Sequence, residues 1–330
     1  MIVEILDAGR LAIAAARHFG TAVEIEGLER LSGGASRETW AFAATGPDGL
    51  AIPLILRREP SSGGVALAPR VPEYQLIGLA AEAGAPIAPL RFALEPEDGL
   101  GIGFVSDRVA GETLGRRIVV DPSFGSVRPL LASQCGRALA AIHSIDVTAS
   151  KLPGLDEGSS SAVAQLDQLT RLVDGFDVAR PVVEFGLRWL RDHAPPVGRR
   201  CVVHGDFRLG NLIVGVDGLR AVLDWELAHV GDPSEDLGWL CVRSWRFGGP
   251  GRVGGVGNLT DLIDGYRSAG GEEVDDERVT YWEVFGNVRW AVICMVQAFT
   301  HLNGFRRSVE LAAIGRRVCE AEHDLMELLS

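Results

Sequence analysis

Lysine is almost absent from this sequence. Lys151 is the only one in 330 residues, and the other 31 of the 32 Lys and Arg residues are arginines. These arginines form no basic cluster, and the formal net charge is -12. An acidic chain without a basic patch is a poor candidate for binding nucleic acid or an anionic membrane. The acidity would favour a cationic substrate, although acidic chains are common among proteins.

Cysteine is scarce too, and long apolar runs are missing. Five widely spaced cysteines include no C-x-x-C pair: Cys135, Cys201, Cys241, Cys294 and Cys319. This usage argues against a disulfide framework or a zinc site, and it favours buried thiols in a reducing cytoplasm. No uncharged apolar run reaches the ~18 residues of a spanning helix, and the acidic N-terminus does not resemble a signal peptide. We therefore expect a cytoplasmic protein that spans no membrane.

The apolar pattern divides the chain into a strand-rich first part and a helical second part. After an amphipathic segment over 5–19, strand-like runs cover 25–31, 39–44, 51–57, 90–94 and 102–109, and a helix is predicted over 71–83. Further helices are predicted over 129–144, 160–174, 180–193, 235–245, 259–269 and two segments from 276 onward. We predict an α+β fold with a small antiparallel β lobe (1–105), a larger helical lobe (106–330) and a ligand-binding cleft between them.

Residues 200–224 interrupt the helices with short strands and carry the most informative polar residues. Asp206 follows the end of one strand, Asn211 precedes the next, and Asp224 ends a third. A β-ribbon over 212–223 would bring Asn211 and Asp224 side by side. Magnesium prefers hard oxygen ligands such as these, and phosphoryl transfer from ATP also requires a carboxylate that orients the acceptor hydroxyl. The segment thus favours magnesium-dependent phosphotransfer.

The same segment resembles the aminoglycoside phosphotransferase family, whose pattern is H-G-D-x-x-x-x-N followed by D-x-E. His204-Gly-Asp206, Asn211 and Asp224-Trp-Glu226 match it, and residues 231–237 match a further G-D-P-x-x-D-L. The resemblance implies a kinase-like two-lobed fold, Asp206 as catalytic base, and Asn211 and Asp224 as magnesium ligands. Within this family, the sequences of these motifs most resemble the kinase-like domains associated with acyl-CoA dehydrogenases.

The resemblance extends into the first lobe and implies an ATP site there. Residues 31–40 resemble a phosphate-covering loop and the strand after it, and residues 104–109 resemble a strand entering the hinge, with Ser106 as gatekeeper. The implied nucleotide-binding residues are Gly33, Gly34, Ser36, Arg57, Glu73, Asp107 and Val109.

One position departs from the family pattern. Arg57 stands where kinases carry a lysine, and the only lysine lies far along the chain. Arginine keeps the positive charge and can bind phosphate bidentately, but its planar fork is larger. Glu73 is implied as its ion-pair partner, and Arg208 is a second candidate cation for the γ-phosphate.

Three alternatives were weighed against a small-molecule kinase. A protein kinase would need a longer segment than the eleven residues between Asp224 and Asp236, and no A-P-E follows. A non-catalytic, nucleotide-binding pseudokinase remains open because of Arg57, and a metal-dependent phosphatase lacks the ligands for a second metal. His204, Trp225 and Trp239 are interpreted as structural. The sequence leaves open which small molecule donates the acceptor hydroxyl and whether the chain forms oligomers.

Overall fold

The structure is a computed structural model that describes residues 6–31, 37–59, 72–147, 152–153, 155 and 161–330. Its strands are β1 (Glu24–Arg30), β2 (Glu38–Thr45), β3 (Ala51–Arg58), β4 (Leu90–Ala93), β5 (Gly103–Asp107), β6 (Cys201–Val203), β7 (Leu212–Gly215), β8 (Gly218–Val222) and β9 (His229–Gly231). Its helices are α1 (Ala8–Phe19), α2 (Glu73–Glu82), α3 (Gly115–Val120), α4 (Arg128–His143), α6 (Ala162–Asp174), α7 (Pro181–Asp192), α8 (Ser234–Cys241), α9 (Leu259–Ser268), α10 (Asp276–Leu302), α11 (Val309–Arg316) and α12 (Val318–Leu328).

The first five strands form one antiparallel sheet in the order β1-β2-β3-β5-β4. Side chains alternate across β3: Leu54 and Leu56 are fully buried, whereas Ile55 and Arg57 on the opposite face are only partly covered. Leu54 and Leu56 pack in one cluster with Leu11 of α1. The sheet therefore buries one face beneath α1 and turns the face that carries Arg57 towards the rest of the molecule.

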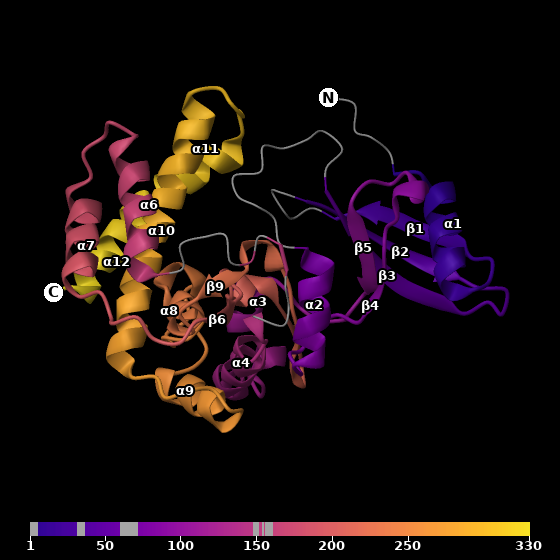
Figure 1. Ribbon diagram of the computed structural model, residues 1–330, viewed down its shortest axis with the longest axis horizontal. Helices are drawn as coiled ribbons and strands as arrows, with labels where there is room; N and C mark the ends of the chain where they lie inside the picture. Colours follow the sequence, from indigo (N-terminus) through magenta and orange to yellow (C-terminus); the bar gives the residue numbers. More distant parts are fainter. Residues whose placement is uncertain (1–5, 32–36, 60–71, 148–151, 154, 156–160) are drawn as a thin grey trace.

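The larger lobe lies beyond α2. The sheet and α1 occupy one end of the long axis, α6, α7 and α10–α12 occupy the other, and α2 lies between them (Figure 1). The apolar side of α2, including Leu76 and Ile77, belongs to the same buried cluster as Leu139 of α4 and Phe207. Thus α2 lies between β3 and β4 in sequence but packs on the second lobe. The lobe boundary between residues 105 and 106 stays a prediction, and β5 runs across it.

The short strands within the helical lobe, β6 to β9, include one that was not predicted. β7 and β8 form an antiparallel hairpin with Leu212 opposite Val222, which confirms the expected ribbon. A second pair joins β6 to β9, a three-residue strand that the sequence reasoning missed. These short strands carry the catalytic motif between them, and α8 begins directly after β9.

Several predicted boundaries were wrong. The helix expected over 235–245 ends at Cys241, and a 3-10 turn follows over Arg243–Trp245. The short helix α3 was not predicted, and the segment after 276 contains three helices rather than two. Four cysteines are buried as expected, whereas Cys319 is exposed. None of the helices in the described ranges combines the length and apolar character that crossing a membrane requires.

Candidate active site

The catalytic motif forms a tight loop after β6, and a glycine is needed within it. Gly205 has a φ of 77°, in the left-handed region that glycine occupies without strain. A Cβ at this position would lie 2.3 Å from the carbonyl oxygen of Leu227. Both the conformation and the space therefore exclude a larger residue, and the chain can turn here to present Asp206.

Asp206 lies at the centre of a converging set of donors. Trp239 Nε1 donates to Oδ1 at 2.8 Å, and Asn211 Nδ2 donates to Oδ2 at 2.6 Å. Arg208 Nε contacts both oxygens, at 3.1 and 3.3 Å. The carboxylate is 17% exposed, so it is fixed in orientation and still reachable. A carboxylate held in this way suits the acceptance of a proton from a bound hydroxyl.

Two buried side chains, those of Asp236 and His143, hold the loop in place. Asp236 accepts hydrogen bonds from the backbone N–H of His204 at 2.7 Å and from that of Gly205 at 2.9 Å. Its Oδ2 also contacts Nε2 of His143 at 3.1 Å. Burial alone would raise the pKa of Asp236, but these hydrogen bonds and the nearby histidines lower it below its ordinary value. Through Asp236, the G-D-P-x-x-D-L segment thus holds the loop in place.

His204 braces the loop rather than facing a ligand. The ring is fully buried, with Nε2 3.0 Å from the carbonyl oxygen of Leu223 and Nδ1 3.2 Å from the backbone nitrogen of Asp206. Burial lowers its pKa, which favours the neutral ring that can donate from Nε2 and accept at Nδ1. These contacts connect the catalytic loop to the strand end that carries Asp224.

Asn211 and Asp224 lie at the same end of the β7–β8 hairpin. The N–H of Leu223 donates to the carbonyl oxygen of Asn211 at 2.8 Å, which places the two residues on neighbouring strands. Asn211 uses its amide nitrogen on Asp206, so its side-chain oxygen is the atom left for a metal. Asp224 has a φ of 69°, an uncommon conformation for a residue with a side chain. The chain therefore changes direction at Asp224, the residue that carries the carboxylate.

Arg57 reaches this carboxylate from the sheet. Its guanidinium pairs with Asp224, and its Nε lies 3.3 Å from Oε1 of Glu73. Burial alone would lower the pKa of Arg57, but Glu73, Asp224 and Glu226 raise it above its ordinary value. Burial raises the pKa of Glu73, and Arg57 and Arg37 oppose this shift. The predicted Arg57–Glu73 pair is present.

Arg37 is a partner of Glu73 that the sequence reasoning missed. Its Nη1 lies 2.7 Å from Oε2 of Glu73, and both side chains are buried. Arg37 lies one residue before β2, next to the loop that was expected to cover phosphate. No spacing rule predicted this contact, because it depends on how α2 packs beside the sheet.

Arg57, Glu73, Asn211 and Asp224 line one cavity of about 540 Å³, which we call the interlobe cleft. The sheet contributes Thr39, Ile55 and Arg57, α2 contributes Glu73 and Ile77, and the catalytic segment contributes Arg208, Asn211 and Asp224. Apolar side chains line the end near Ser106: Ile77, Leu90, Phe104, Ile213 and Val222. A cleft with an apolar end and a charged end fits a ligand that has a flat aromatic part and an anionic part.

The remaining predicted residues fall into three groups. Asp107 and Val109 line the interlobe cleft, but the carboxylate of Asp107 is held bidentately by Arg91, at 2.6 and 2.8 Å. Only the backbone of Asp107 is therefore a candidate nucleotide contact. The indole ring of Trp225 is buried in the core, and the buried Trp239 also contacts Asp206, a role the sequence did not reveal. Gly33, Gly34 and Ser36 lie outside the described residues.

Solved structures with the same fold are phosphotransferases. A protein from Ralstonia eutropha JMP134, described as a candidate aminoglycoside phosphotransferase, superposes with a TM-score of 0.75 at 22% identity, covering 98% of both chains. The macrolide 2'-phosphotransferase of Brachybacterium faecium gives 0.61 at 17% identity, covering 94% of this chain and 97% of that one. A spectinomycin phosphotransferase solved with ADP and spectinomycin gives 0.63 at 14% identity, covering 98% and 99%. At these identities the likeness shows the fold, which is the α+β, kinase-like fold expected.

Curated relatives bear on the narrower resemblance, the one to kinase-like domains associated with acyl-CoA dehydrogenases. Mouse acyl-CoA dehydrogenase family member 10 is 29% identical over 197 residues, which is 57% of this chain and 18% of that protein. Chicken family member 11 is 33% identical over 132 residues, which is 37% of this chain and 17% of that protein. The chain thus spans less than a fifth of the length of these relatives, and the expected likeness to their kinase-like domains is confirmed.

The sequence profile of one family covers most of the chain. The phosphotransferase enzyme family matches residues 27–273, a range that begins within β1 and ends after α9. That range includes Arg57, Glu73, the catalytic loop and Asp224, so the residues described above lie within the matched part. The chain therefore belongs to the phosphotransferase enzyme family.

Proposed function

We propose that this protein is an ATP- and magnesium-dependent kinase that transfers the γ-phosphoryl group to a hydroxyl of a small molecule. One observation carries the proposal: Arg57, Asn211 and Asp224 line the interlobe cleft together, and Asn211 contacts Asp206 beside it. The family and the nucleotides named in related structures support it.

The residues fit a magnesium site. Among the described residues no group of three or more His, Cys, Asp or Glu side chains could hold a metal by itself. Magnesium requires no such group, since it keeps several waters and is bound by one or two protein oxygens together with substrate phosphates. Asn211 offers a side-chain oxygen, and Asp224 offers a carboxylate 29% exposed to the cleft. Bound there, magnesium would neutralise phosphate charge and orient the nucleotide.

The chain's own residues would then perform the remaining tasks. Asp206 accepts the proton of the acceptor hydroxyl as its oxygen attacks the γ-phosphorus. Arg57, anchored by Glu73, would contact the α- and β-phosphates, and Arg208 would approach the transferred group. The apolar end of the interlobe cleft would enclose the base, next to the backbone of Asp107 and Val109.

A screen of hydroxyl compounds for ADP production tests the proposal. With Mg·ATP present, at least one compound should accelerate ADP release over the acceptor-free rate, and Asp206→Asn should abolish that acceleration. The competing pseudokinase hypothesis, raised by Arg57, predicts nucleotide binding without turnover. ATP binding combined with no acceptor-dependent ADP release across amino alcohols, sugars, hydroxy acids and phosphorylated alcohols would favour the pseudokinase.

A further inference from the structure

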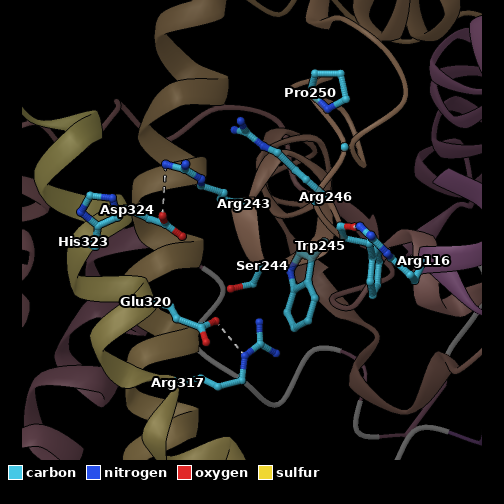
Figure 2. A pocket seen from close by; sticks show the side chains of 13 residues that line it. Arg116, Arg243, Ser244, Trp245, Arg246, Pro250, Arg317, Glu320, His323 and Asp324 are labelled. Carbon is cyan, nitrogen blue, oxygen red and sulfur yellow. Dashed lines mark hydrogen bonds and ion pairs between the residues drawn. The ribbon is translucent and has the colours of Figure 1, made fainter. Parts of the chain in front are cut away.

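A second cavity of about 910 Å³ lies on the other side of the catalytic loop from the interlobe cleft. We call it the arginine cavity because four arginines line it: Arg116, Arg243, Arg246 and Arg317. They come from α3, from the turn after α8 and from the residue preceding α12 (Figure 2). Its volume is in the range of cavities that enclose a whole small molecule.

The charge of the arginine cavity is opposite to that of the chain. Among the described residues, two carboxylates belong to its lining, those of Glu320 and Asp324, against four arginines, although the whole protein carries a formal charge of -12. Figure 2 shows these two carboxylates beside Arg317 and Arg243, at 2.9 and 3.4 Å. Two carboxylates outside the lining, Glu327 and Glu283, pair with Arg243 and Arg246. Three of the four arginines are thus paired with carboxylates, and the attraction for an anion depends on the fourth, Arg116.

Arg116 is the arginine whose charge is not matched by a carboxylate. Its Nη1 donates to the carbonyl oxygen of Phe247 at 2.8 Å, and across the described ranges no acidic side chain lies within 4.0 Å of it. By contrast, Arg246 pairs with the buried Glu283 at 2.6 Å. A carbonyl orients a guanidinium without neutralising it, so Arg116 retains its charge for a ligand.

The lining also contains two polar atoms without partners. Trp245 is buried, and neither its Nε1 nor the hydroxyl of Ser244 has a hydrogen-bond partner within the described part of the chain. Buried polar groups are nearly always paired. Both atoms are shielded from solvent, so they lie in the wall of the cavity without opening into it. Figure 2 shows both side chains on the side of the hollow that faces Arg317 and Glu320.

The arginine cavity shares a wall with the catalytic centre. The guanidinium of Arg208 stacks over the ring of Trp245 at 4.7 Å, and Arg208 also lines the interlobe cleft and contacts Asp206. Trp239, which donates to Asp206, packs against Trp245 with ring centroids 5.2 Å apart. The two cavities are thus separated by Arg208 and two indole rings. Asp206 lines neither cavity, but it contacts Arg208 and Trp239 of this partition, and its carboxylate is 17% exposed.

We propose that the arginine cavity binds the phosphate acceptor, and that the acceptor carries an anionic group, a carboxylate or a phosphate, besides the hydroxyl. This inference rests on the proposed function. Arg116 and Arg317 bind the anionic group, and the hydroxyl lies at Asp206. A bond forms between the hydroxyl oxygen and the γ-phosphorus, the bond from that phosphorus to the bridging β-oxygen breaks, the hydroxyl proton passes to Asp206, and ADP leaves. Cationic acceptors, which the acidic composition alone would favour, are excluded by like charge.

Acceptors that share a skeleton and differ in charge provide the test. Glucosamine, glucose, glucuronate and glucose 6-phosphate form one such series, and each further hydroxy acid or phosphorylated alcohol in the panel is paired with its neutral parent. Binding is measured by calorimetry with the interlobe cleft saturated by Mg·ADP, and turnover by ADP release from Mg·ATP. The variants are Arg116→Ala, Arg116→Lys and Arg116→Glu. Arg137→Ala is the matched control, because Arg137 is exposed on α4 and also donates to a neutral oxygen, Ser133 Oγ.

The proposal expects anionic members to bind and react better than their neutral parents, and cationic members to be weakest. Losing one charge-assisted hydrogen bond should weaken binding of the anionic acceptor by about 10- to 100-fold in Arg116→Ala. Arg116→Glu should weaken it further, Arg116→Lys should restore part of it, and Arg137→Ala should bind as wild type does. KM for ATP should stay constant throughout the series. The pair of glucuronate and glucose 6-phosphate separates a carboxylate preference from a phosphate preference.

Other outcomes distinguish this inference from the function on which it rests. Asp206-dependent turnover of neutral or cationic acceptors at equal or higher kcat/KM would overturn the inference and leave the kinase activity standing. Anion binding that depends on Arg116 without any turnover would refute the kinase proposal and retain an anion site. Binding that is equal in wild type and Arg116→Glu would remove the arginine cavity from recognition altogether.

Discussion

The interlobe cleft and the arginine cavity both contain arginines, but they hold them differently. In the cleft, Arg57 is paired with Glu73 and Asp224. In the cavity, Arg116 donates to a carbonyl oxygen and has no carboxylate partner among the described residues. The other three arginines of the cavity are paired with carboxylates, as Arg57 is. A cation matched by internal carboxylates keeps its position when no ligand is bound, and a ligand must compete for it. A cation held by a carbonyl keeps its orientation and its full attraction for an anion. The difference suggests a preorganised nucleotide site beside a site selective for acceptor charge.

Asp206 contacts Arg208 and Trp239 between the two cavities and is the proposed base, so its loss should produce the largest effect. Asp206→Asn keeps the shape of the side chain but cannot take a proton, and the rate of transfer should fall by roughly 10²–10⁴-fold. Binding of Mg·ATP and of the acceptor should persist, because each is held by other residues. Single-turnover kinetics together with calorimetry of both ligands measure this. Retention of more than half the wild-type kcat would show that Asp206 is not the base.

Asp224 tests the nucleotide side alone. Removing an outer-shell partner of a metal site typically lowers metal affinity or activity by about 10–100-fold. Asp224→Ala removes a proposed direct ligand, so it should weaken the response to Mg²⁺ by about 100-fold or more. Titrating Mg²⁺ at fixed ATP measures it, and adenosine should bind almost as before. Asp217→Ala is the control, since Asp217 is an exposed aspartate in the turn of the same hairpin and pairs with Arg220. An unchanged magnesium response in Asp224→Ala would remove Asp224 from the metal site.

Arg57 sharpens the comparison with Arg116. Arg57→Ala should raise KM for ATP and lower kcat, with a loss in kcat/KM of about 10- to 100-fold for one charge-assisted contact, while acceptor binding stays constant. Arg57→Lys should fall between alanine and wild type, because lysine restores the charge and not the planar fork.

The neighbouring Arg58 provides the control for these substitutions. It faces the opposite side of β3 and pairs with Glu38 at 2.8 Å, so Arg58→Lys should leave KM for ATP near the wild-type value. If Arg57→Ala cost nothing, Arg208 would become the phosphate-binding cation and the pseudokinase hypothesis would gain support.

His229 lines neither of the two cavities and reports on stability alone, with the smallest effect. Burial lowers its pKa, but Glu235, 3.3 Å away, more than compensates, so the folded pKa lies above 6.5. The stabilisation from this pair is complete below about pH 6.5 and is lost as the pH rises through the folded pKa. It should amount to at most about 1 kcal/mol.

Urea unfolding of His229→Gln at pH 6, 7 and 8 measures this contribution. The variant should be less stable than wild type at pH 6, and the gap should narrow at pH 8. His193→Gln is the control for the substitution itself, because His193 is exposed and contacts the carbonyl oxygen and the ring of Trp189 rather than a carboxylate. A gap that stays constant with pH would show that the pair is not linked to protonation.

Much of the fold could be predicted because the apolar pattern in it is local. The strands of the first sheet and the helices α1, α2, α4 and α9 lie within a few residues of the predicted ranges. Errors occurred where the pattern is short or uniform. β9 has only three residues, and every residue of α8 is buried, so periodicity marked neither its end at Cys241 nor the turn that follows. That turn carries Trp245, which proved central to the second cavity.

The sequence by itself determined the family, the kinase-like fold and the order of the catalytic residues. It could do so because Asp206 and Asn211 come just before, and Asp224 just after, one short hairpin of two apolar strands joined by a tight turn. Only the tertiary structure decided what surrounds them. Arg37 meets Glu73, Trp239 meets Asp206, and Arg116 lines a hollow with Arg317, two hundred residues apart in the chain. Such contacts depend on how whole helices pack, and a net charge summed over the chain says nothing of where its positive charges gather.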